Sequence, residues 1–257
     1  MFPEFAKMEK KKKPKIGFFA LTSCEGCEVS LLDLGEEFFD FLKNEIDLVE
    51  FHLIEEMPFP KGKIDIAFVE GLPLRKEEIF LLKKIRKKAK ILVSLGNCAT
   101  LGGIPEIRNY QKKLNPDLPL KESPEVKELK EIVKVDFSIP GCPINGKEFL
   151  KYAKILVKEM KIPQIPQKPI CSECPWQGTN NCFLKKKEPC LGPITLFGCG
   201  AICPQNNSLC YGCRGFLKGA NIKKYLNLIK TFKSAKEIEE NLEIFGLKDE
   251  INNPTYS

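Results

Sequence analysis

The chain has 257 residues, of which 43% are hydrophobic and 29% charged, and its formal net charge is +7. No run of about 18 apolar residues occurs, so we expect no membrane-spanning segment. The first residues, MFPEFAKMEKKKKPK, lack the apolar stretch and small-residue cleavage site of a secretory signal and the arginine pair of a twin-arginine signal. The sequence therefore predicts a cytoplasmic protein with room for a large core and a second, smaller unit.

Short apolar runs alternate with helical segments in the first 160 residues. We expect strands at Ile16–Ala20, Asp47–Ile54, Ile64–Val69, Ile91–Leu95 and Val135–Ile139. We expect helices at Val29–Lys43, Lys76–Lys88, Pro124–Val133 and Lys147–Met160. Strands that alternate with helices at this spacing predict an α/β fold with a flavodoxin-like, doubly wound parallel sheet.

The character of the chain changes at the prolines of positions 163, 166 and 169, which predict an extended linker. The next stretch, Cys171–Cys213, holds eight cysteines with little apolar periodicity, and bound metal is the usual substitute for a missing core. Beyond Gly219 we expect two helices, the last of which begins with a capping box of Ser234 and Glu237.

The expected organisation therefore has three parts. Residues 1–14 form a basic extension, residues 15–162 form the flavodoxin-like domain, and residues 163–257 form a largely irregular, metal-binding domain with short helices.

Twelve cysteines require a chemical explanation. An intracellular protein of this size keeps its thiols reduced, and the pairs at positions 24/27, 171/174 and 210/213 have the spacing of metal ligands, so we disfavour disulfides. Three oxidised 4Fe-4S clusters with their thiolates would contribute a charge of about −6. The basic excess then offsets bound clusters and gives no reason to expect a nucleic-acid partner.

The first four cysteines follow three of the expected strands. Cys24 and Cys27 follow the first strand, Cys98 follows Ile91–Leu95, and Cys142 follows the last strand. Because parallel strands end at one edge of a sheet, these loops should meet there and form a four-thiolate site. Zinc also uses four cysteines, but structural zinc sites normally have two local pairs, so the single pair and two remote cysteines favour an iron-sulfur cluster.

Glu70 ends another expected strand and should point to the same edge, either beside the cluster and its ligands or as a solvated carboxylate. His52, the only histidine, lies within a strand pattern, and we expect a structural role for it.

The later cysteines divide at the apolar, glycine-containing stretch LGPITLFG. One set is Cys171, Cys174, Cys182 and Cys190, and the other is Cys199, Cys203, Cys210 and Cys213. Each set can hold one 4Fe-4S cluster, although interleaved sets and two zinc ribbons remain open. Three clusters in one chain form an electron wire, and no catalytic nucleophile or acid-base pair stands out.

Four motifs carry a resemblance to a known family: SCEGCEVSLLDL, VEG, LGNCATLGGIP and IPGCPINGKEF. They resemble the small subunit of nickel-iron hydrogenases and, more distantly, the electron-transfer subunit of respiratory complex I. The resemblance implies a proximal 4Fe-4S cluster on Cys24, Cys27, Cys98 and Cys142, close to a nickel-iron centre in the partner large subunit.

The second half of the chain is similar to a cytoplasmic branch of that family, which includes the sulfhydrogenase delta subunit. Periplasmic members use one histidine at the distal cluster and only three cysteines at the medial one, whereas both sets here are complete. PCLGP resembles the end of the distal motif and CYGCRG the end of the medial motif. The resemblance thus makes the set from Cys171 to Cys190 distal and the set from Cys199 to Cys213 medial.

The implied function is electron transfer between the nickel-iron site, where hydrogen is oxidised or protons are reduced, and a flavin or iron-sulfur partner subunit. Two alternatives remain: an electron-transfer subunit of a complex I-like or other nickel-free oxidoreductase, and a multi-zinc structural protein.

Overall fold

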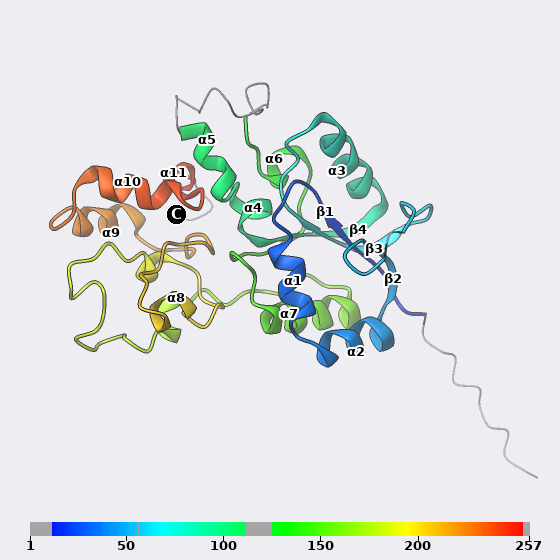
Figure 1. The fold of residues 1–257 in the computed structure, drawn as a ribbon, viewed down its shortest axis with the longest axis horizontal. Helices are drawn as coiled ribbons and strands as arrows, with labels where there is room; N and C mark the ends of the chain where they lie inside the picture. Colours follow the sequence, from blue (N-terminus) through cyan, green and yellow to red (C-terminus); the bar gives the residue numbers. More distant parts are fainter. Residues whose placement is uncertain (1–11, 56, 111–124, 254–257) are drawn as a thin grey trace, which may run out of the picture.

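The computed structural model describes residues 12–55, 57–110 and 125–253 (Figure 1). Five strands form one sheet in the order β2-β1-β3-β4-β5, and every neighbouring pair is parallel. The strands are β1 (Lys15–Ala20), β2 (Asp47–Phe51), β3 (Ile64–Glu70), β4 (Ala89–Leu95) and β5 (Phe137–Ile139). This is the flavodoxin-like order, so the predicted fold class is confirmed.

Helices cover both faces of the sheet. On one face the buried side chains of the strands pack with those of α1 (Gly26–Leu32), α2 (Glu36–Glu45) and α7 (Gly146–Glu159). On the other face they pack with α3 (Lys76–Lys88), α4 (Gly96–Leu101) and α6 (Leu129–Ile132). Alternate residues of β1 serve the two cores, because Phe18 belongs to the first and Phe19 to the second.

Phe18 lies at the centre of the first core. Its ring centroid is 4.7–6.0 Å from those of four other phenylalanines: Phe38, Phe51, Phe68 and Phe149. All five rings are buried, and aromatic contacts of this kind add stabilisation beyond the burial of apolar area. This core holds α1 and α7 against the sheet and thereby fixes the loops at its carboxyl edge.

Some expected boundaries were wrong. The single helix expected at Val29–Lys43 is two helices, because Gly35 adopts a φ of 55° between α1 and α2. The second strand ends at Phe51, and the last begins at Phe137. The helix expected from Pro124 is only the short α6, and Pro124 itself lies outside the described residues.

Helix α4 was missed. It begins directly where β4 ends and carries Cys98, so this cysteine lies on a helical turn and not in a loop. A six-residue helix of sequence GNCATL offers no amphipathic period to detect. Two further short helices, η1 (Ile104–Glu106) and α5 (Ile107–Tyr110), follow it.

The chain from Pro163 to Gly215 is irregular, with three short helices: η3 (Ile170–Glu173), η4 (Gly192–Ile194) and α8 (Ile202–Gln205). Then follow α9 (Ile222–Ile229), α10 (Ala235–Glu243) and α11 (Leu247–Glu250). The capping box of Ser234 and Glu237 is confirmed at the start of α10. These helices share a small core with Leu101 of α4. Within the described ranges, no helix has the length and apolarity needed to cross a membrane.

Candidate functional site

Four cysteines gather at the carboxyl edge of the sheet. Cys27 lies in the first turn of α1, Cys98 lies in α4, and Cys142 follows β5. Burial, followed by the charges of Cys142 and Cys24, raises the pKa of the Cys98 thiol to about 12. The pKa of Cys27 is likewise raised, first by burial and then by groups that include Glu70, Cys142 and Cys98. The structure thus brings together the four residues of the expected proximal set.

Glycine backbone packs directly against these thiols. A Cβ atom on Gly96 would lie 2.4 Å from the Sγ of Cys27, and one on Gly103 would lie 2.9 Å from the Sγ of Cys98. Gly96 also has a φ of +83°, a backbone conformation that residues with a side chain rarely adopt. A four-thiolate donor set enclosed by bare backbone fits an iron-sulfur cluster, whose sulfurs accept hydrogen bonds from backbone N–H groups.

Glu70, the last residue of β3, lies beneath this site. Its carboxylate accepts hydrogen bonds from the backbone N–H groups of Cys27, at 3.2 Å, and Glu28, at 2.9 Å. The residue is only 3% exposed, and burial raises the pKa of its carboxyl. Glu70 therefore holds the first turn of α1 in place, and the alternative of a solvated strand-end carboxylate was wrong.

His52 lies just after β2, not within a strand. Its Nε2 is 3.1 Å from Oε1 of Glu25, and its Nδ1 is 3.8 Å from Oε2 of Glu28. Glu28 is fully buried, and burial, followed by the charge of Glu70, raises the pKa of its carboxyl to about 8. Sequence reasoning missed this group, because a charged residue after a cysteine pair gives no sign that it is buried.

The expected distal cysteines line one cavity of about 370 Å³ in the irregular segment, together with Cys210. Burial, followed by the neighbouring charges of Cys190, Cys174 and Cys182, raises the pKa of the Cys171 thiol to about 12. A Cβ on Gly192 would meet the Sγ of Cys171 at 3.2 Å, so bare backbone borders this set as well.

Cys213 lies with Cys199 and Cys203. Burial, together with the charges of Cys199 and Cys203, raises the pKa of the Cys213 thiol to about 12. The backbone N–H of Cys142 lowers it, which places Cys213 beside the sheet-edge set. Asn97 of α4 ties the two parts together, because its Nδ2 donates to the carbonyl of Cys213 at 2.9 Å.

Cys210, a member of the second set, also lines the cavity of the first set. Burial raises the pKa of its thiol, and the charges of Cys190 and Cys213 act in the same direction. The structure therefore orders the cysteines as sheet edge, then Cys213, then Cys210, then the cavity of Cys171.

The described residues contain no group of three or more His, Cys, Asp or Glu side chains arranged to hold a single metal ion. A 4Fe-4S cluster gives each thiolate its own iron atom, so its ligands surround the cluster without converging on one ion.

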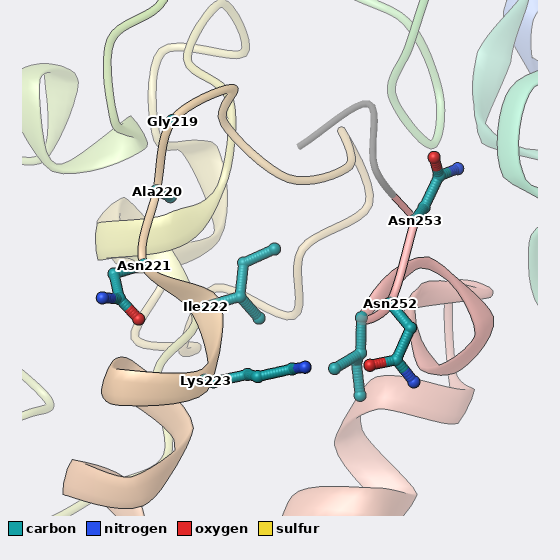
Figure 2. Close-up of a pocket in the computed structure, with 8 residues that line it drawn as sticks. Gly219, Ala220, Asn221, Ile222, Lys223, Asn252 and Asn253 are labelled. Carbon is teal, nitrogen blue, oxygen red and sulfur yellow. The ribbon is translucent and has the colours of Figure 1, made fainter. Parts of the chain in front are cut away.

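A further hollow of about 360 Å³ lies between the start of α9 and the last described residues (Figure 2). Ile222 and Lys223 border it on one side and Asn252 on the other, and no cysteine lines it. It offers no metal-binding chemistry.

The sequence of this chain is similar to a known protein family and to several characterised proteins. Residues 24–156 match the family model of the NADH ubiquinone oxidoreductase 20 Kd subunit. The chain is 33% identical over 237 residues to the sulfhydrogenase 2 subunit delta of Pyrococcus furiosus, covering 90% of this chain and 99% of that protein. It is 34% identical to a vhu subunit of the F420-non-reducing hydrogenase of Methanocaldococcus jannaschii, covering 78% of this chain and 81% of that protein.

Solved structures show the same fold. A chain of an NAD⁺-reducing NiFe hydrogenase in its H₂-reduced state superposes with a TM-score of 0.51 at 26% identity, over 60% of this chain and 96% of that one. The actinobacterial-type NiFe hydrogenase of Ralstonia eutropha H16 gives a TM-score of 0.61 at 18% identity, over 94% of this chain and 92% of that one, and supports the fold alone. The chain therefore belongs to the family of the NADH ubiquinone oxidoreductase 20 Kd subunit and, within it, to the small subunits of nickel-iron hydrogenases.

Proposed function

We propose that this chain is the electron-relay small subunit of a cytoplasmic nickel-iron hydrogenase. It carries electrons between a nickel-iron centre in the large subunit, where hydrogen is oxidised or protons are reduced, and a flavin or iron-sulfur partner subunit. Residues 15–162 form the domain that docks the large subunit, residues 163–257 form the domain that passes electrons onward, and residues 1–14 form a basic extension.

Three 4Fe-4S clusters are assigned to three cysteine sets. The proximal ligands are Cys24, Cys27, Cys98 and Cys142, with Glu70 beside them. The distal ligands are Cys171, Cys174, Cys182 and Cys190, and the medial ligands are Cys199, Cys203, Cys210 and Cys213. The observation that carries the proposal is the sequence of contacts from Cys142 to Cys213 and from Cys210 to Cys190, because electrons cross a protein by short hops between neighbouring centres.

The test is the metal content of the natively purified complex, prepared without oxygen. About twelve iron atoms for each copy of this chain, with nickel co-purifying, would support the proposal. Zinc in place of iron would contradict it.

A second function is favoured by the family model, which describes a complex I subunit. In that case the same relay serves an oxidoreductase whose large subunit lacks nickel. Twelve iron atoms without nickel, and no hydrogen-dependent reduction of the clusters, would support this function over the first.

A further inference from the structure

Arg214 connects the two cysteine-bearing parts of the chain and follows Cys213 directly. The side chain is almost completely buried, with 1% of its surface exposed. Burying a guanidinium is costly unless its charge is paired and its N–H groups are hydrogen-bonded. The donors of Arg214 therefore identify the groups that this residue holds in place.

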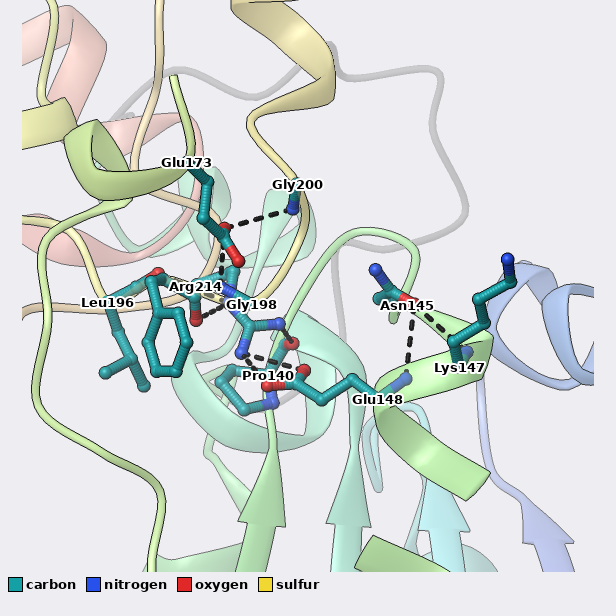
Figure 3. Close-up of polar contacts among 10 residues, drawn as sticks. Pro140, Asn145, Lys147, Glu148, Glu173, Leu196, Gly198, Gly200 and Arg214 are labelled. Atoms are coloured by element: carbon teal, nitrogen blue, oxygen red, sulfur yellow. Dashed lines mark hydrogen bonds and ion pairs between the residues drawn. The ribbon is translucent and has the colours of Figure 1, made fainter. Parts of the chain in front are cut away.

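The guanidinium donates in three directions (Figure 3). Nη1 donates to the carbonyl of Pro140 at 2.6 Å, and Nη2 lies 2.9 Å from both carboxylate oxygens of Glu148. Nε donates to the carbonyls of Leu196, at 3.2 Å, and Phe197, at 2.7 Å. Only the planar fork of arginine can serve these partners at once, since a lysine ammonium is a single point of charge.

These partners belong to both sides of the proposed proximal-to-medial junction. Pro140 stands two residues before Cys142, and Glu148 lies in the first turn of α7. Phe197 stands two residues before Cys199. Arg214 therefore joins the loop of one proposed proximal ligand to the loops of two proposed medial ligands.

The packing leaves little freedom at this clasp. A Cβ on Gly198 would lie 2.3 Å from Oε1 of Glu148 and 2.5 Å from Nη2 of Arg214, so the ion pair touches the chain just before Cys199. Glu173 secures the same turn from the other side, because its Oε2 accepts from the N–H groups of Gly198 and Gly200 at 2.9 and 3.0 Å.

The charge of Arg214 also acts on the medial ligands. Arg214 follows Cys213 directly, and its Nε donates to the carbonyl of Phe197, two residues before Cys199, at 2.7 Å, so its positive charge lies close to both ligands. The reduced form of a cluster carries one more negative charge than the oxidised form, so a positive charge at this place favours the reduced form of a cluster bound there.

We propose that Arg214 is a positioning residue of the electron relay, which clamps the Cys142 loop against Cys213 and raises the reduction potential of the medial cluster. This inference rests on the proposed function. One electron leaves the reduced proximal cluster, which is thereby oxidised, and is taken up by the oxidised medial cluster, and no proton or bond change accompanies the transfer.

The experiment is a redox titration at pH 8.5, monitored by electron paramagnetic resonance, of the whole complex carrying Arg214→Met. We expect about a tenfold shift of the medial cluster toward its oxidised form, equivalent to about 59 mV for one electron, with proximal and distal potentials unchanged. Arg214→Lys keeps the charge, so its medial potential should stay near that of the wild type while electron transfer from the proximal cluster slows several-fold.

Arg86→Met is the matched control. Arg86 also pairs with a carboxylate, Asp136, but at the opposite edge of the sheet, so loss of this pair should shift no cluster potential. If Arg214→Met prevents assembly, Glu148→Gln tests the same clasp, and removal of its negative charge should shift the medial potential upward.

The possible outcomes separate the two proposals. An unchanged medial potential in Arg214→Met would overturn the inference. Where that variant does not assemble, an unchanged medial potential in Glu148→Gln would do so. An equal shift of the medial potential in the control Arg86→Met would also overturn it. A wild-type complex with fewer than three cluster signals would instead overturn the proposed function.

Discussion

The backbone N–H of Cys210 donates a hydrogen bond to the Sγ of Cys190 over 3.4 Å. These cysteines belong to different proposed clusters, so one hydrogen bond separates a medial ligand from a distal ligand. N–H donors to cluster sulfur raise the reduction potential, and a bonded path between two ligands shortens the route of an electron. Because Cys210 contacts a proposed distal ligand, its assignment decides how the eight later cysteines divide between the two clusters.

Serine substitutions test this partition. Cys182→Ser should lose about four iron atoms with the distal signal, and Cys199→Ser should lose about four with the medial signal. We expect Cys210→Ser to behave like Cys199→Ser. Iron analysis and electron paramagnetic resonance of the purified complexes measure both effects. Loss of the distal signal alone in Cys210→Ser would instead support interleaved sets.

Cys142→Ala should remove or remodel the proximal cluster, because the variant leaves three thiolates at the sheet edge. Electrons from the large subunit would then have no entry to the relay, so hydrogen-dependent reduction of the physiological partner should fall at least tenfold. Hydrogen-dependent dye reduction that persists unchanged in the Cys142→Ala complex would argue against the proximal assignment.

Gly96→Ala should weaken cluster binding at the same edge, since the added Cβ would lie 2.4 Å from the Sγ of Cys27 at a φ of +83°. Gly219→Ala is the matched control: its φ is +77°, but nothing lies within 4 Å of the added Cβ. Both variants carry the backbone cost of about 1 kcal/mol, and only Gly96→Ala should lose proximal iron. Equal iron content in both would show that the close packing around Cys27 is dispensable.

The sheet could be predicted from the sequence because each strand is a short apolar run between turn residues, and parallel pairing brings the following cysteines to one edge. The break between α1 and α2 could not, because residues on both sides continue an apolar helical pattern and only the φ of Gly35 separates them. Helix α4 is shorter than two turns and shows no period.

At the site, the sequence predicted which cysteines meet but not what holds them. Glu70 could be placed at the sheet edge from its position after a strand, yet its burial depends on the N–H groups of Cys27 and Glu28. Two partners of Arg214, Glu148 and Pro140, lie 66 and 74 residues away from it in the sequence. No local pattern marks such contacts, since they arise only when the two parts of the chain pack together.

Glu106 should make stability fall as the pH rises. Its carboxyl is 5% exposed, its Oε2 has no hydrogen-bond partner among the described residues, and burial, followed by the charge of Glu128, raises its pKa to about 8. The native state therefore keeps a proton that the unfolded chain releases near pH 4.5, so stability is lost as the pH rises between these values.

Glu106→Gln removes this penalty. We expect it to stabilise the protein by on the order of 2–4 kcal/mol at pH 9 and by little at pH 5, measured by thermal unfolding at both values. Glu240→Gln, on the exposed face of α10, should change neither. A gain for Glu106→Gln that is the same at both pH values would contradict the assignment.

Removal of iron should unfold the irregular segment and spare the sheet. The small apolar cluster around the distal cysteines has only Ile170, Cys190, Ala201 and Cys210 as buried members, whereas the sheet is covered by two extensive cores. Leu191 and Ile194 pack instead into the core of the C-terminal helices, so metal binding must supply most of the folding free energy of the rest of Cys171–Cys213. Hydrogen exchange of the chelator-treated complex should show lost amide protection there and retained protection in β1, β3 and β4.

Helices α9 and α10 should keep intermediate protection, because their own apolar core includes Leu101 of α4. Retained protection throughout Cys171–Cys213 after complete loss of iron would show that this segment folds without its metal.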